Sequence, residues 1–240
     1  NLCAQKGLFY PPDPASFKFS TIGGNIAEDA GGMRAVKYGV THNFVMGLEV
    51  VLADGRIIKT GGKSIKNVTG YNMTQLIVGS EGTLGIVTKA ILRLIPMPKF
   101  RNTLLLMFPT LDGACDTIHQ MLQAGIVPAS AELMDRTCLK AIAKNRKFDF
   151  PDTAQDLIVT EVDGSEEYEI KKQAEQIEKI ANINGVVEIR IAKTAQEADD
   201  LWAIRRALSP AVGALAPDRI SEDISVPRNE FPEIVRRIRT

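Results

Sequence analysis

Glycine is distributed very unevenly along this chain. Residues 1–98 contain 14 of the 19 glycines, whereas residues 99–240 contain only 5. Because glycine favours turns and close backbone approaches, the first part is expected to be rich in turns and the second in regular helices and strands. Pro96 and Pro98 lie at the change in composition, where two prolines end a strand and stiffen a connection. The sequence therefore predicts two domains, residues 1–98 and 99–240.

Composition restricts the class of protein. The chain is 45% hydrophobic and 24% charged, as globular proteins are. Basic and acidic residues number 29 each, which removes the basic surface expected of a nucleic-acid-binding protein. No apolar run reaches the roughly 18 residues that would span a bilayer. A soluble protein with a small or neutral partner is predicted.

The cysteines and the first residues bear on the cellular compartment. Cys3, Cys115 and Cys138 are far apart and form no CxxC pair, which favours neither a disulfide framework nor a zinc site. A reducing cytoplasm fits this pattern. The sequence starts at Asn1 and has no signal-peptide pattern, so we expect it to begin inside a longer chain.

Local patterns predict the secondary structure. In the first part, residues 46–53 and 56–60 flank Asp54-Gly55, a dipeptide typical of a hairpin turn, and residues 83–95 resemble one long strand. The second part alternates predicted strands (102–108, 129–134, 156–162, 186–192, 219–226) with predicted helices (111–124, 137–145, 166–183, 195–209 and one from about Glu230). Thr194 and Glu197 form a capping box that starts the helix of Trp202. The alternation predicts a sheet covered by helices mainly on one face.

Two glycine-rich segments are the strongest candidates for ligand binding. The first runs from Ser20 to Gly32, where paired glycines allow a backbone nest for a diphosphate, although a pair of tight turns explains them equally well. The second has glycines at positions 79, 82 and 85, but it is not GxGxxG and lacks the surrounding βαβ unit of a Rossmann site. The segment 61–64 resembles a Walker A end, yet Ile57 stands where that loop needs glycine.

Few side chains are candidates for chemistry. Arg205 and Arg206 follow Trp202 on the capped helix, and an inward arginine binds a carboxylate through its planar fork of donors. A solvated helix face with Trp202 in the core is the alternative. His42 and His119 share no nearby acid or cysteine pattern, so both are predicted to be structural.

Read as a whole, residues 7–98, with STIGGNIAEDAGG and GSEGTLGIV, closely resemble the second half of the FAD-binding domain of the glycolate oxidase D-subunit and D-lactate dehydrogenase type, within the vanillyl-alcohol oxidase flavoproteins. LWAIRRALSPAVG and ISEDISVPRNEFPEIVRRI resemble that family's substrate or cap domain more loosely. The resemblance implies an α+β fold. It consists of the second subdomain of a vanillyl-alcohol oxidase-type FAD-binding domain followed by a ferredoxin-like cap domain.

The resemblance also implies site residues. Arg205 matches an arginine that binds the substrate carboxylate, and Ser209 a hydroxyl position near it. No residue matches a catalytic base or a metal ligand. The positions that match FAD contacts are Pro14, Ser16, Ser20, Thr21, Gly23, Gly24, Asn25, Glu28, Asp29, Ala30, Gly31, Gly32, Glu81, Gly82, Ile86 and Val87.

The activity implied is oxidation of a 2-hydroxy acid, glycolate or D-lactate, by hydride transfer to FAD. Electrons would leave to partner redox subunits or a quinone, in the cytoplasm or at the inner membrane face through those partners. The family's first FAD-binding half and its H-x-G-D-G-N-x-H motif, which serves a divalent metal and the base, are expected outside this sequence. We therefore expect this chain alone neither to retain FAD tightly nor to turn over substrate. The alternatives are a non-catalytic assembly or binding module, and an FAD-linked oxidase for an alkyl ether lipid or a sugar lactone.

Overall fold

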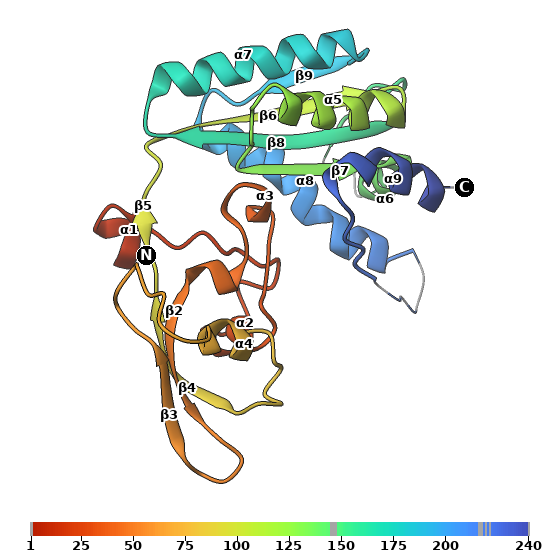
Figure 1. The fold of residues 1–240 in the computed structure, drawn as a ribbon. Helices are drawn as coiled ribbons and strands as arrows, with labels where there is room; N and C mark the ends of the chain where they lie inside the picture. Colours follow the sequence, from red (N-terminus) through yellow and green to blue (C-terminus); the bar gives the residue numbers. More distant parts are fainter. Residues whose placement is uncertain (1, 145–147, 216–217, 219, 221, 240) are drawn as a thin grey trace. The chain divides into compact units, whose positions relative to one another are not determined.

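The computed structural model describes residues 2–144, 148–215, 218, 220 and 222–239. The chain divides into two compact units, Asn1–Pro98 (unit 1) and Lys99–Thr240 (unit 2), shown in Figure 1. None of the helices in the described ranges combines the length and the apolar character needed to cross a membrane.

Unit 1 is built around a three-stranded antiparallel sheet of order β3-β2-β4. Its elements are α1 (Leu2–Gln5), β1 (Leu8–Phe9), α2 (Ile22–Ala27), α3 (Ala35–Tyr38), the 3-10 helix η1 (Thr41–Phe44), β2 (Val45–Val51), β3 (Ile57–Gly61), α4 (Met73–Ile77), β4 (Ile86–Leu92) and β5 (Ile95–Pro96). The short strands β1 and β5 pair separately. The predicted hairpin is confirmed, because β2 pairs with β3 from Val51↔Ile57 onward and Gly55 adopts a φ of 83° in the turn.

The predicted long strand over residues 83–95 is wrong at both ends. Thr83 N–H donates to the carbonyl of Ser80, which closes a turn, and Gly85 has a φ of 155°, so pairing begins only at Ile86. The strand stops at Leu92, and a separate two-residue strand follows at Ile95. Glycine turn geometry thus outweighs the β-branched composition of this segment.

One face of the unit 1 sheet is packed and the other carries charge. The core contains Ile26 of α2, Leu48 and Val50 of β2, and Ile77 at the end of α4. On the sheet, Glu49 lies across from Lys59 and Lys89 on the flanking strands, and its carboxylate is 3.0 Å from the Lys89 ammonium. Such one-sided packing is usual for an antiparallel sheet.

Unit 2 contains a four-stranded antiparallel sheet of order β7-β8-β6-β9. Its elements are β6 (Phe100–Phe108), α5 (Leu111–Gln123), β7 (Ser130–Met134), α6 (Arg136–Ala143), β8 (Asp156–Gly164), α7 (Glu167–Ile183), β9 (Glu188–Ile191), α8 (Ala195–Gly213), η2 (Arg228–Glu230) and α9 (Phe231–Arg239). Leaving α6 aside, β6 to β9 follow the β-α-β-β-α-β order of ferredoxin-like units. The α+β class is confirmed.

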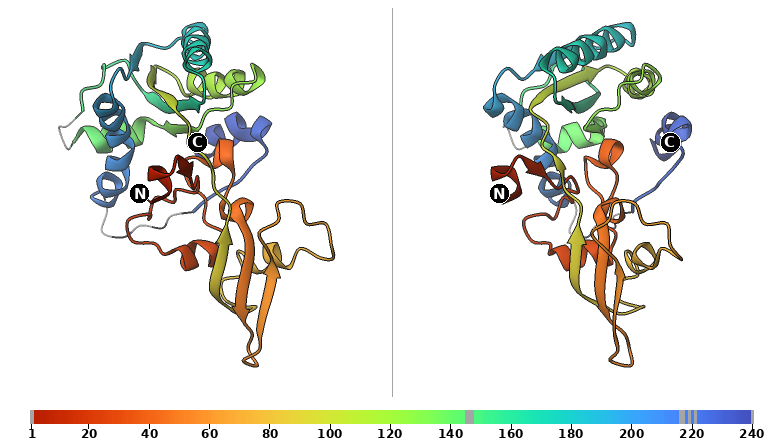
Figure 2. Two further views of the ribbon diagram at one scale, coloured as in Figure 1. Left: turned by 90° about the vertical axis from the view of Figure 1, so that its left-hand side faces the viewer. Right: turned by 60° about the vertical axis from the view of Figure 1, so that its left-hand side comes forward.

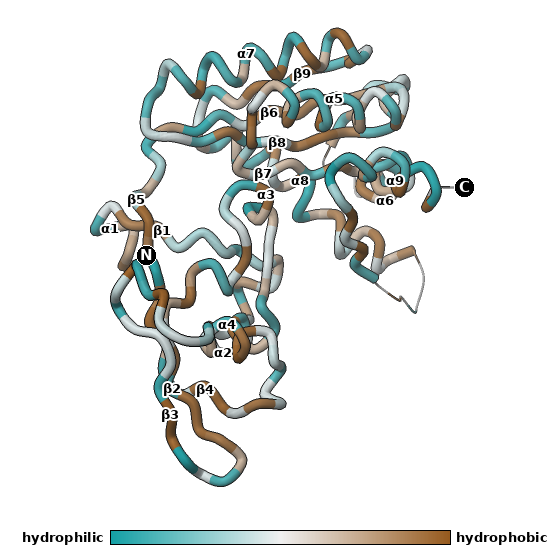
Figure 3. Tube along the Cα trace, viewed as in Figure 1, coloured by the Kyte–Doolittle hydropathy of each residue, from teal (hydrophilic) through white to brown (hydrophobic). Residues whose placement is uncertain are grey.

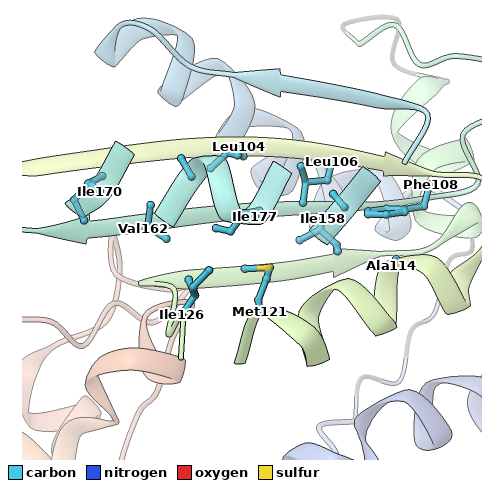
Figure 4. Packing of buried hydrophobic residues seen from close by; sticks show 12 residues of the cluster. Leu104, Leu106, Phe108, Ala114, Met121, Ile126, Ile158, Val162, Ile170 and Ile177 are labelled. Atoms are coloured by element: carbon cyan, nitrogen blue, oxygen red, sulfur yellow. The ribbon is translucent and has the colours of Figure 1, made fainter. Parts of the chain in front are cut away.

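The helices cover both faces of the unit 2 sheet, so the prediction of a sheet covered mainly on one face is wrong. Leu104, Leu106 and Phe108 of β6 pack with α5 and α7 (Figure 4), whereas Leu105 and Met107 pack with α6 and α8. Figure 2 shows α7 along one side of the sheet and α8 along the other. The cause is the continuous apolar run 104–108: side chains alternate between the two faces of a strand, so both faces of β6 are apolar and both must be buried. Figure 3 shows β6 and β8 as hydrophobic stretches.

The helix boundaries show how local chemistry acts. Thr194 caps α8, since its Oγ1 accepts from Glu197 N–H at 3.1 Å, as predicted. The Glu197 carboxylate, however, accepts from Lys193 N–H at 2.7 Å, one residue earlier than in a regular capping box. The helix also continues to Gly213 through Pro210, four residues beyond its predicted end. Asn145, the predicted end of the helix over residues 137–145 (α6), lies outside the described residues.

The predicted strand over residues 219–226 is wrong where the structure describes it. Residues 222–227 have no regular secondary structure, and Arg219 and Ser221 lie outside the described residues. Ile220 and Ile224, which lie within the predicted strand, are exposed and add nothing to either core of unit 2. A β-rich composition therefore does not form a strand here without a sheet to pack on.

Leu105→Ala and Leu106→Ala test the double-sided packing of β6. Both side chains are fully buried, on opposite faces, so each truncation should lower the free energy of unfolding of unit 2 by about 2–5 kcal/mol. The single tryptophan, Trp202, lies in unit 2, and its fluorescence during urea unfolding reports the loss.

Ile183→Ala is the matched control, because this side chain is exposed on α7 and should change stability by at most about 0.5 kcal/mol. If Leu105→Ala were as mild as this control, the second face would not be a core.

Candidate functional site

The two glycine-rich segments are hydrogen-bonded to each other in unit 1. Gly79 N–H donates to the carbonyl of Ile26 at 2.9 Å, and Glu81 N–H donates to the carbonyl of Ala27 at 3.0 Å. A Cβ at Gly79 would lie 3.2 Å from Cβ of Asp29. The turn before β4 is thus attached to the end of α2.

The first turn of α2 presents backbone to solvent. Thr21 caps the helix by accepting from Gly24 N–H at 3.0 Å, and Gly23 and Gly24 are exposed. The nearest heavy atom to a Cβ at Gly23 would be Thr21 Oγ1, 3.9 Å away, so no neighbouring side chain crowds this backbone. Gly82, in the adjacent turn, is equally open. A flat or phosphorylated ligand has close access to both backbones.

The loop after α2 lies against the segment that precedes it. A Cβ at Gly32 would overlap the Asp13 carbonyl, and Arg34 N–H donates to the Asp13 carboxylate at 3.1 Å. Only glycine permits this approach. This contact places the loop 28–32 beside Asp13. Pro14, the residue after Asp13, therefore lies close to the same loop.

The predicted FAD contacts all lie in unit 1. Pro14, Ser16 and Ser20 belong to the stretch before α2, and Asn25 is a buried residue of that helix. Ile86 and Val87 open β4; Ile86 is exposed, whereas Val87 packs against the core. None of these positions lines either hollow described below. Residues 14–32 and 79–82, which contain all of these positions except Ile86 and Val87, are called the glycine surface.

Two acidic residues of this surface have left-handed backbones. Asp29 has a φ of 50° and Glu81 a φ of 52°, and across the described residues no other non-glycine residue has a positive φ. Such conformations are held by their surroundings and concentrate at functional sites.

Asp29 has a partner that sequence reasoning missed. Its carboxylate lies 2.6 Å from His42 Nδ1 and also accepts from the His42 N–H at 2.7 Å. The two residues are 13 positions apart, Asp29 in the turn after α2 and His42 in η1, so neither helical nor strand periodicity relates them. His42 was predicted to be structural because no acidic residue pattern lies near it in the sequence, and no local signal could have revealed this pair.

In unit 2, Arg205 belongs to a half-buried ion pair. Its Nε donates to the Glu132 carboxylate on β7 at 2.6 Å, with side-chain exposures of 30% and 21%. Arg206 instead meets Asp199 at the solvated side of α8. The solvated-face alternative thus describes Arg206 and not Arg205. Ser209 lies on α8 and is exposed.

A hollow of about 540 Å³ lies beside Glu132, between β7, α6 and α9. Its charged lining residues are Glu132 and Asp135, which suits no carboxylate. Cys138 also lines it; burial raises the pKa of this thiol to about 11, and Asp135 adds to the shift. The thiol is protonated at neutral pH and is a poor nucleophile. The described residues contain no group of three or more side chains suited to a metal ion.

Comparison with known proteins gives two matching family models. Residues 97–240 match the model "FAD linked oxidases, C-terminal domain", and residues 1–61 match "FAD binding domain". The chain is 47% identical to "Glycolate oxidase subunit GlcD" of Bacillus subtilis, over 98% of this chain and 50% of that protein. It is 35% identical to "D-lactate dehydrogenase" of Anaerostipes hadrus, over 96% and 50%. The chain spans about half the length of these relatives.

A solved structure, alkyldihydroxyacetonephosphate synthase, shares the fold with a TM-score of 0.70 at 24% identity, over 90% of this chain and 43% of that one. At this identity the likeness concerns the fold alone. The family match covers all of unit 2 and most of unit 1, and the similarity to the two bacterial relatives runs through both. The chain therefore belongs to the FAD-linked oxidase family and is a homologue of glycolate oxidase subunits and D-lactate dehydrogenases.

Proposed function

We propose that this chain forms part of a flavoenzyme that oxidises a 2-hydroxy acid, glycolate or D-lactate, to the 2-oxo acid. Residues 1–98 would belong to a vanillyl-alcohol oxidase-type FAD-binding domain, and residues 99–240 to a cap domain that binds substrate. The observation that carries the proposal is the hydrogen-bonded contact between the two glycine-rich segments, in a chain of this family.

The glycine surface fits FAD. Its open backbone at Gly23 and Gly82 allows the diphosphate to approach the chain without a Cβ in the way. Acidic side chains would repel a diphosphate; the Asp29 carboxylate is engaged with His42, and the exposed Glu28 and Glu81 would contribute backbone alone. When bound, FAD supplies the hydride acceptor. We propose that residues 20–25, 28–32, 81 and 82 hold it, largely through backbone.

Arg205 is proposed to hold the substrate carboxylate. Glu132 occupies its Nε, which leaves the two terminal nitrogens of the guanidinium for a bidentate contact. Glu132 thereby positions the guanidinium, and Ser209 lies one turn later on α8. The proposal assigns the base that removes the hydroxyl proton to none of the described residues.

The Bacillus subtilis relative is named as a subunit. We propose that electrons pass from the flavin to partner redox subunits, in the cytoplasm or at the inner membrane face.

Gly23→Asp tests the glycine surface. A carboxylate at this open position should repel the diphosphate and weaken FAD binding at least about tenfold, a loss of ~1.4 kcal/mol, in a titration followed by flavin fluorescence. Gly62→Asp is the control, since Gly62 is equally open and lies outside the glycine surface. Equal weakening by both would indicate a general charge effect and no site at α2.

Arg205→Leu tests the substrate anchor in a protein of the relatives' full length. Loss of a bidentate carboxylate contact should lower kcat/KM for the hydroxy acid by about 100-fold. Arg206→Leu is the control, because Arg206 is the next residue of the helix and its ion pair with Asp199 lies at the surface. It should leave kcat/KM within about threefold, since a surface ion pair contributes little energy. Unchanged kinetics in Arg205→Leu would remove this residue from the carboxylate role.

A further inference from the structure

We propose that unit 1 contains a second binding site, which takes a small oxyanion bearing a carboxylate or phosphate group. The site is a hollow of about 410 Å³ between η1, the paired ends of β2 and β3, the loop 62–72 and α4. None of the residues proposed to hold FAD lines it. The proposal therefore stands independently of the flavin function.

The charge of the lining favours an anion. His42, Lys59 and Arg93 are the lining residues that carry or can carry positive charge, and none of the described lining residues is acidic. Arg93 is exposed, and no described residue forms an ion pair with it. Its backbone N–H donates to the Phe44 carbonyl at 2.7 Å, which fixes it beside the segment of His42. An unpaired guanidinium next to a hollow is a ready partner for a carboxylate or phosphate.

Three asparagine side chains that line the hollow can offer NH₂ donors to a ligand. Asn43 Oδ1 accepts from Val40 N–H, Asn67 Oδ1 from Thr69 N–H and Asn72 Oδ1 from Gln75 N–H, at 2.9, 3.3 and 3.1 Å. Each asparagine thus uses its oxygen on its own loop, which leaves the NH₂ group. Three such amides around one hollow match a ligand that only accepts hydrogen bonds.

His42 is held in one orientation at this hollow. Asp29 accepts from its Nδ1 side at 2.6 Å and from its backbone N–H at 2.7 Å, so the ring cannot turn without breaking the pair. This contact leaves Nε2 as the ring nitrogen available to a ligand. Asp29 also belongs to the glycine surface. An anion beside His42 would therefore be linked, through the His42–Asp29 pair, to the loop 28–32 proposed to hold FAD.

The test is a titration of the ¹⁵N-labelled 240-residue chain, followed by amide chemical shifts at constant pH and ionic strength. Inorganic phosphate and malonate are the two probes, and the tighter one identifies the ligand as a phosphate or a carboxylate. We expect saturable shifts at amides that line the hollow, including Gly61, Ser64 and Gln75. Arg93→Gln should weaken binding at least about tenfold, as expected on loss of a charged hydrogen bond.

Arg56→Gln is the matched control, because Arg56 lies in the β2–β3 hairpin turn, pairs with Asp54 and does not line the hollow. It should keep the wild-type affinity. Lys59→Gln is a second loss variant if Arg93→Gln does not fold. Absence of saturation with both anions, shifts confined to the glycine surface, or equal affinities of Arg93→Gln and wild type would overturn the proposal.

Discussion

Two backbone hydrogen bonds, from Gly79 to Ile26 and from Glu81 to Ala27, hold the candidate cofactor surface together. Ile26 is fully buried in the unit 1 core and Val78 is nearly so, which ties both glycine segments to the same apolar cluster. The hydrogen bonds and the core fix the two glycine segments relative to each other. The backbone at Gly23 and Gly82 stays open to a ligand. The left-handed backbones of Asp29 and Glu81 are the conformational cost of joining these segments, roughly 1–3 kcal/mol each for sparsely populated backbone.

Unit 2 positions its candidate anchor by a different device, a sheet packed on both faces. The apolar run of β6 requires helices on each side, and the second layer is what brings α8 across the sheet. Arg205 then meets Glu132 of the edge strand β7 in a half-buried pair. Replacing one partner of such a pair leaves the other charge unpaired in a half-buried position. Substitution of either residue is therefore expected to destabilise unit 2. The same core that stabilises the domain therefore orients the guanidinium.

Much of the fold followed from local sequence patterns. The Asp54-Gly55 hairpin, the cap at Thr194 and the strands and helices from β6 to α8 were predicted closely, because turn chemistry and hydrophobic periodicity act over a few residues. The second helical layer was missed because a run such as Leu104 to Phe108 does not reveal how many layers bury it. The pairs His42–Asp29 and Arg205–Glu132 join residues 13 and 73 positions apart, and only the folded chain brings them together. The strand at 219–226 failed for the related reason that composition cannot supply a neighbouring strand.

The most direct test of the joined glycine surface is hydrogen–deuterium exchange, with and without FAD, of a protein of the relatives' full length that contains this chain. If the two segments form one binding surface, FAD should slow exchange of the amides at 22–25 and at 79–82 together, while the β2–β3 hairpin turn stays unchanged. Slowing at only one segment, or at neither with saturating FAD, would contradict a shared surface.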